Sequence, residues 1–274
     1  MHRRHRPWRL GFTLSATALI AACGSSRDGN RSPGDTFAVT SDNRLVSFDL
    51  DTRAIRTSAE IDNLQAGEQI VGIDIRPAST AAQTLYALSS AGRLYTLDVR
   101  SGAATLVATR AADPADATAP FAGLSGAAFG VDFNPVVDRL RVVSDTGQNL
   151  RINVDTGATT TDGALLADAA PLAGVSATAY SNAFADACRT THFFIDTTND
   201  RLLTAISSND GTLAATGALG VDADAVNGFD VLTKADGSNT LVAALAVGAT
   251  QRLYTLNATT GAASDQGLVT GLRS

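Results

Sequence analysis

The chain has 274 residues and a formal charge of −6, with 27 acidic against 21 basic residues. An excess of negative charge repels phosphate backbones, so nucleic acid is excluded as an expected partner. All but two of the acids are aspartates, which favour turns, whereas the helix formers glutamate and lysine are rare. This composition favours an all-β protein, and the length allows one large core.

The first 22 residues have the pattern of a secretory signal. A basic stretch with four arginines and no acid precedes the apolar run GFTLSATALIAA, which is too short to span a membrane as a helix. The run ends in LIAAC, which resembles the bacterial lipobox; the resemblance implies that Cys23 is lipidated and anchors the chain to a membrane. The alternative is ordinary cleavage after Ala22 beside a chance cysteine. Gly24, in place of an aspartate, favours the outer membrane, with the domain in the periplasm or at the cell surface.

A flexible tether and one globular domain are expected to follow. Residues 23–35 continue from the cysteine as GSSRDGNRSPGD, which has no large apolar side chain. The domain then occupies residues 36–274. Loss of residues 1–22 removes four arginines and no acid, which lowers the formal charge to −10. Cys188 is the only cysteine besides Cys23, so lipidation leaves no pair for a disulfide, and we expect a monomer stabilised by its core.

One phrase recurs along the domain, and this repetition is the strongest signal in the sequence. The copies VGIDIRP, FGVDFNP and NGFDVLT share an aspartate, and a weaker copy, TAYSNAF, aligns with a serine at that position. In chain order these positions are Asp74, Asp132, Ser181 and Asp230. A second phrase of the type RLYTLDVRSG follows each copy, and an incomplete version of it occupies residues 44–61.

Each repeat divides into four short runs of alternating apolar and polar residues, separated by Gly, Asp, Asn and Ser. Alternation with period two predicts antiparallel strands, and Ser-Gly, Thr-Gly and Asp-Gly pairs supply the positive φ of tight hairpins. Four strands per unit at a period of about 40–60 residues predict propeller blades, which must stack around an axis to bury their faces. We therefore predict an all-β fold, a five-bladed β-propeller of four-stranded antiparallel blades, with a flat or sandwich arrangement as the alternative.

The blades are expected at residues 36–66, 67–115, 126–170, 175–220 and 225–274. The first blade lacks its own copy of the aspartate phrase. In propellers such a gap is usually filled from the other end of the chain, yet only the few residues from Gly271 to Ser274 remain after the last blade. Closure of the ring, by a short edge strand, is therefore the least determined part of the fold.

In these phrases the chain resembles DUF4394, a family of bacterial proteins that share a domain of unknown function. The similarity rests on VGIDIRP, on FGVDFNPVVDRLRVVSDTGQNLRINVDTG, on the following TTDGAL and on NDGTLAATGALGVDA, and it covers residues 36–270. The resemblance implies an exported, repeat-built β-protein of propeller type and implies no activity. The serine in blade four and the abrupt C-terminus depart from the pattern.

The three aspartates are the candidate functional residues. Each lies two positions after a glycine that would let an inner strand approach the axis, so the carboxylates are expected near the channel or a hairpin end. In one interpretation, which repetition favours, each carboxylate accepts hydrogen bonds from backbone N–H groups of the adjacent turn in its own blade. In the other, the carboxylates, which would otherwise repel one another, bind Ca²⁺ or a small ligand in the channel. The residues that could join them are Ser181 and Asn182 as ligands and Arg76, Arg141 and Arg151 as counter-charges.

Most other chemistry lacks residues to carry it. Beyond residue 22 the only histidine is His192, which follows Cys188 in CRTTH; in an exposed loop, this pair gives neither a metal site nor a catalytic triad. No phosphate-binding glycine loop is present. A carbohydrate-acting hydrolase remains the enzyme alternative, although residues 23–274 contain no tryptophan to stack on a sugar.

We therefore expect an exported, lipid-anchored propeller that serves as a binding or scaffold module rather than an enzyme, without a cofactor apart from the Ca²⁺ alternative. Central binding of a cation or small ligand and carbohydrate hydrolysis are the alternatives. The runs at residues 112–120 and 168–175 connect blades and are long enough to bind a protein partner, with a plain linker as the equal alternative.

Overall fold

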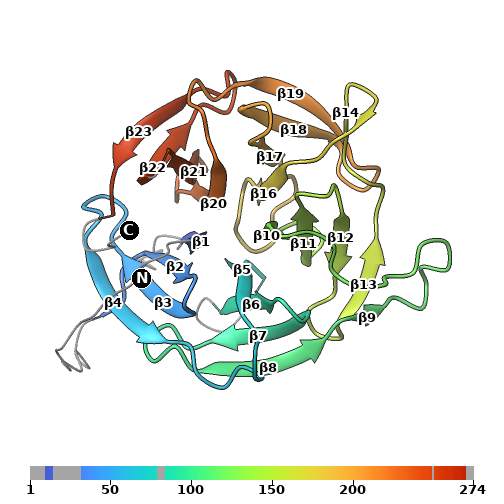
Figure 1. Cartoon of the computed structure of the whole chain (residues 1–274), viewed down its shortest axis with the longest axis horizontal. Helices are drawn as coiled ribbons and strands as arrows, with labels where there is room; N and C mark the ends of the chain where they lie inside the picture. Colours follow the sequence, from blue (N-terminus) through green and yellow to red (C-terminus); the bar gives the residue numbers. More distant parts are fainter. Residues whose placement is uncertain (1–9, 15–31, 79–83, 249, 270–274) are drawn as a thin grey trace.

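The computed structural model describes residues 10–14, 32–78, 84–248 and 250–269, and in this part of the chain the strands form five sheets around a common axis (Figure 1). This arrangement confirms the five-bladed β-propeller. The described residues form no helix, and therefore none that is long and apolar enough to cross a membrane. Cys23 and residues 24–31 lie outside the described residues, as do Gly271–Ser274.

Blades two and five have the predicted four antiparallel strands in chain order from the axis outward. Blade two consists of β5 (Ile70–Ile75), β6 (Leu85–Ser89), β7 (Arg93–Leu97) and β8 (Ala104–Thr109). Blade five consists of β20 (Ala225–Thr233), β21 (Asn239–Val247), β22 (Thr250–Leu256) and β23 (Ala263–Gly267).

Blades three and four have the same four strands and additional short ones on their outer edges. Blade three consists of β10 (Phe129–Asn134), β11 (Arg139–Ser144), β12 (Asn149–Ile152), β13 (Ala158–Thr161) and the outer β9 (Ala111–Ala112). Blade four consists of β16 (Val175–Tyr180), β17 (His192–Asp196), β18 (Arg201–Ser207), β19 (Thr212–Ala218) and the outer β14 (Leu166–Ala167) and β15 (Ala170–Pro171). The two long connections thus pair, in part, with outer strands; a partner for them stays a prediction.

The predicted hairpin glycines also join the blades to one another. Gly102, Gly157 and Gly261 each follow Ser or Thr between the third and fourth strands and each have φ 78°. A Cβ at Gly102 would overlap the carbonyl oxygen of Glu60, at the end of the preceding blade, and one at Gly157 would overlap that of Thr109. The turn therefore needs glycine twice, for its left-handed backbone and for the close approach of the next blade.

The buried core is divided among the junctions between blades. In the described part of the chain five buried apolar clusters occur, and each joins two neighbouring blades. Between the last and first blades, Ala38 and Phe48 pack with Val242 and Leu253. Ring closure therefore has the same apolar basis as the other four junctions.

Blade one contains a strand that the sequence assigned to the signal. Its strands are β1 (Leu10–Leu14), β2 (Thr36–Thr40), β3 (Arg44–Phe48) and β4 (Ile55–Glu60). β1 pairs with β2 in parallel, unlike the inner strands of the other blades, and lies beside β5 and β20 near the axis (Figure 1). The inner place in blade one is thus occupied by an N-terminal strand.

Candidate functional site at the centre of the ring

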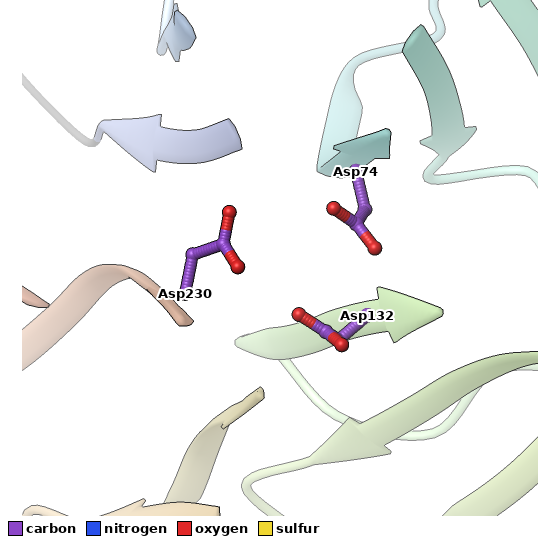
Figure 2. Close-up of side chains that lie close together, drawn as sticks. All are labelled: Asp74, Asp132 and Asp230. Atoms are coloured by element: carbon purple, nitrogen blue, oxygen red, sulfur yellow. The ribbon is translucent and has the colours of Figure 1, made fainter. Parts of the chain in front are cut away.

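Three aspartates from three blades converge at the axis. Asp74 lies on β5, Asp132 on β10 and Asp230 on β20, and Figure 2 shows their carboxylates pointing toward one another. One oxygen from each lies within 4.8 Å of one from each of the others. All three residues are buried, with exposed fractions of 7%, 3% and 5%. The repeated aspartates therefore form one compact cluster rather than three separate sites.

Small residues make this convergence feasible, as the sequence predicted. A Cβ on Gly72 would overlap the side chain of Val131 in the next blade, and a Cβ on Gly130 would overlap the backbone of Ala177. Neither glycine has a positive φ, so the requirement is for space and not for unusual backbone geometry. Each glycine brings its own aspartate, two residues later, close to the next inner strand.

Backbone N–H groups of the neighbouring blade bind two of the carboxylates. The N–H of Phe133 donates to Asp74 Oδ2 at 2.6 Å, and the N–H of Tyr180 donates to Asp132 Oδ1 at 3.0 Å. The N–H of Ile75 also donates to Asp74 Oδ1, and that of Val231 to Asp230 Oδ1, both at 2.6 Å. The expected donors in adjacent turns were therefore wrong: the aspartates bind inner strands, and Asp74 and Asp132 join consecutive blades.

Burial and mutual repulsion dominate the electrostatics of the cluster. Burial raises the pKa of Asp74 well above its usual value, and the charge of Asp230 raises it further. Burial likewise raises the pKa of Asp132, followed by the charges of Asp74 and Asp230. Asp132 Oδ2 receives no hydrogen bond from the described residues. The centre therefore concentrates negative charge that favours protons or a cation.

Blade four contributes no carboxylate to the cluster, and its alignment in the sequence was wrong by two residues. Phe133 and Tyr180 make equivalent bonds to the aspartates of the blades before them. Tyr180 is therefore the counterpart of Phe133, and buried Ala179 takes the place of Asp132. The aromatic residues Phe133 and Tyr180 mark the register that the structure shows, whereas Ser181 suggested an alignment two residues away.

Ser181 and Asn182 consequently do not join the aspartates. The hydroxyl of Ser181 accepts the N–H of Thr191 at 2.7 Å within its own blade. The side-chain oxygen of Asn182 accepts a hydrogen bond at 2.9 Å from the amide of Asn239 in blade five. Both residues hold backbone segments beyond the inner strand.

Arg76 is not a counter-charge for the cluster either. Its guanidinium forms ion pairs with Asp138 and Asp155, the latter at 2.7 Å, and these charge-assisted bonds connect blade two to blade three. The same arginine lowers the pKa of Asp155.

Arg141 and Arg151 share Asp162 as their acidic partner. Arg141 Nη1 and Arg151 Nε each donate to Asp162 Oδ2 at 2.6 Å. Arg151 Nη2 also donates to Asp162 Oδ1 at 2.8 Å, which makes that pair bidentate. These arginines form a separate site between blades three and four, which the sequence did not reveal.

The histidine also differs from expectation, since it is buried rather than in an exposed loop. His192 begins β17, is 4% exposed and stacks on Tyr180 with 3.8 Å between the ring centroids. Burial lowers the pKa of His192 well below its usual value, and the charge of Arg141 lowers it further. Its ring nitrogens are hydrogen-bonded to Thr178 and Ser208, so it is a neutral core residue, whereas Cys188 is an exposed free cysteine.

Comparison with known proteins identifies a family. Residues 44–273 match the family described as Domain of unknown function (DUF4394). No curated protein matches the sequence. Among solved structures, the chain is similar to Myxococcus xanthus glutaminyl cyclase, with 12% identity over 92% of each chain and a TM-score of 0.47.

Two further structures give similar values. An auxiliary nutrient binding protein from Bacteroides thetaiotaomicron VPI-5482 shares 12% identity over 76% of this chain and 55% of its own, with a TM-score of 0.44. BamB from Moraxella catarrhalis shares 14% identity over 83% and 62%, with a TM-score of 0.31. Such low identities and TM-scores carry no argument about activity.

Proposed function

Because the chain belongs to the DUF4394 family, which is described without an activity, we propose a function from its geometry: a binding propeller whose three central aspartates hold a divalent cation. The observation that carries this proposal is the convergence of three buried carboxylates within 4.8 Å. At that separation, two ionised carboxylates repel by about 3.5 kcal/mol with an effective dielectric constant of about 20. Protons or a cation must offset this repulsion in the folded state.

The geometry suits Ca²⁺ among common cations. Ca²⁺ binds oxygen at about 2.3–2.6 Å, so two of its ligands can lie as much as about 5 Å apart. Three carboxylates can supply up to about six oxygens, the lower end of the Ca²⁺ coordination range. Asp132, with one oxygen that the described residues do not bind, is the ligand most available to the ion.

A cation at this position would stabilise the fold and support ligand binding at the ring, and it would not catalyse the cleavage of a substrate. With β1 in place, the three aspartates are at most 7% exposed, which leaves no surface for a sugar between an acid and a base. The ion would instead join blades two, three and five at the axis. The proposal is therefore a cation-stabilised binding module.

We also propose, from the sequence, that the module is exported and anchored through a lipid on Cys23. Cleavage before Cys23 removes Leu10–Leu14, so the anchored chain and the β1 pairing in blade one exclude each other. In the anchored form the inner edge of β2 would be open. The apolar contacts of Ala38 and Phe48 with Val242 and Leu253 lie outside β1 and would remain.

Calorimetric titration of Ca²⁺ into the metal-stripped full-length chain tests the cation site. We expect one saturable site, and thermal unfolding at 100 times the dissociation constant should show about 2.7 kcal/mol of added stability. Asp132→Asn keeps an oxygen for the N–H of Tyr180 but removes the charge, so it should abolish the Ca²⁺ response.

Asp265→Asn is the matched control, because Asp265 is exposed on β23 and pairs with Arg252 in blade five. This variant should bind Ca²⁺ like the wild type. Absence of binding by the wild type, or an equal response from Asp132→Asn, would show that the aspartates hold protons and backbone groups only.

A further inference from the structure

A second polar site lies between blades three and four, apart from the aspartate cluster. It is a cavity of about 260 Å³, and Asn134 and Tyr180, the last residues of the inner strands β10 and β16, belong to its lining. Its polar lining is cationic and amide-rich, in contrast to the acidic composition of the whole chain. The lining residues are Asn134, Val137, Arg139, Arg141, Arg151, Tyr180 and Asn209.

Arg141 is a buried residue in the lining of this cavity. Its side chain is 2% exposed and is held by Asp162 and by three neutral groups. The contacts are Nε to the Tyr180 hydroxyl at 3.2 Å, Nη1 to Asn149 at 2.7 Å and Nη2 to Asn209 at 2.9 Å. Because a guanidinium has five N–H donors, these four bonds to described residues leave one N–H on Nη2 available.

Arg151 and Arg139 add charge that is only partly compensated. Arg151 uses Nε and Nη2 on Asp162, so both N–H groups of Nη1 receive no acceptor from the described residues. Arg139 Nη1 donates to the backbone carbonyls of Val137 and Asp138, and no described carboxylate forms an ion pair with it. The lining of the cavity thus contains three guanidinium groups. Asp162 is the described carboxylate that pairs with two of them, Arg141 and Arg151, so positive charge is in excess.

We propose that this cavity binds a small organic or inorganic anion through a carboxylate or phosphate group. Guanidinium groups donate charge-assisted hydrogen bonds to both kinds of group. The N–H groups left on Arg141 Nη2 and Arg151 Nη1 can each donate to an oxygen of the anion, and Asp162 already orients both side chains. The amides of Asn134 and Asn209 supply further polar groups for orientation. Positioning by Asp162 limits the side-chain freedom lost on binding.

Size and lining restrict the ligand to a small molecule. The volume is below the range of about 300–1,000 Å³ typical of pockets for drug-sized ligands. Val137 forms an apolar edge and is 53% exposed, so a short aliphatic chain could follow the anionic group. A nucleic-acid backbone does not fit, because such a partner would meet the excess of acidic residues elsewhere on the chain.

The test is calorimetric titration of the full-length chain with inorganic phosphate and, separately, with succinate, at constant ionic strength. We expect saturable binding of at least one of them. Binding of phosphate alone, succinate alone or both would identify the preferred group. Absence of saturable binding of both up to tens of millimolar would overturn the proposal.

Arg151→Gln should weaken the binding about tenfold or more, since it removes a charge-assisted hydrogen bond. Arg252→Gln is the matched control: Arg252 is 34% exposed against 33% for Arg151, and each pairs with an aspartate through Nε. An equal effect of the two substitutions would also overturn the proposal. Arg139→Gln provides a second variant that leaves Asp162 paired. Ca²⁺ titration of the same variants separates this site from the central one. Because Arg151 and Arg139 do not contact the three aspartates, their substitution should leave Ca²⁺ binding unchanged.

Discussion

Removing one central charge should change how the stability of the metal-free protein depends on pH. Asp132→Asn keeps the acceptor for Tyr180 and removes one of the three carboxylates within 4.8 Å. Asp74 and Asp132 have raised pKa values, so the folded wild type retains protons that the unfolded chain loses above about pH 4. The wild type should therefore lose stability as pH rises toward the folded pKa values, and the variant should lose less.

The size of this effect follows from proton linkage. Each proton that the folded cluster holds and the unfolded chain does not changes the free energy of unfolding by about −1.4 kcal/mol per pH unit. His192 opposes this between its lowered folded pKa and about pH 6.5, because the folded state keeps it neutral. The histidine is the same in both proteins, so the difference between wild type and variant isolates the aspartates.

Urea unfolding in EDTA at half-unit steps from pH 5 to pH 8 measures both curves. We expect the stability of Asp132→Asn relative to wild type to increase with pH, by about 1.4 kcal/mol per unit for each additional proton that the folded wild-type cluster holds. Saturating Ca²⁺ should flatten the wild-type curve, since the ion replaces the protons. A difference that is constant or that falls with pH would refute the repulsion between the carboxylates.

Two further predictions concern the blade junctions and the N-terminus. Gly157→Ala should destabilise the protein by more than about 1 kcal/mol, because it combines φ 78° with overlap of a Cβ and the carbonyl oxygen of Thr109. Gly237→Ala, with φ 81° but open space around the Cβ, should destabilise the protein less when both variants are unfolded in urea. Equal losses of stability would show that the close approach of Gly157 to Thr109 does not contribute. Expression in a bacterium with [³H]palmitate should label the wild type and not Cys23→Ser, and intact mass should place Cys23 at the N-terminus. An unlabelled chain that begins before residue 10 would instead support β1 as a permanent strand.

The fold was predictable because each blade repeats the same local chemistry. Alternation, Gly-containing turns and the Gly-x-Asp phrase agree in blades two, three and five, and the structure places Asp74, Asp132 and Asp230 together as the phrase implied. Blade four lacks this phrase, so a serine at a similar spacing gave the wrong register. The small residue Ala177 and the aromatic Tyr180, matching Gly130 and Phe133, carry the correct one.

The arginine site could not be predicted from local patterns. Arg141 lies opposite Asp132 in the β10–β11 ladder, which makes an ion pair between them look natural. In the structure its guanidinium instead binds Asp162 and Asn209, which lie 21 and 68 residues along the chain. Asp162 directly follows β13 of the same blade, whereas the packing of blade four against blade three brings Asn209 to Arg141. His192 stacks on Tyr180, its partner across β16 and β17 within blade four.

The structural and ligand-binding interpretations of the aspartates are compatible. A carboxylate has about four acceptor positions, and the hydrogen bonds to described residues use two on Asp74 and one on Asp132. The N–H groups of Phe133 and Tyr180 therefore fix the orientation of the carboxylates without exhausting them. A residue repeated for the architecture of the blade can then serve a cation at the axis, because the same hydrogen bond that joins two blades holds its oxygens toward the centre. This is why Asp132→Asn, which conserves the joining bond and removes the charge, separates the two roles.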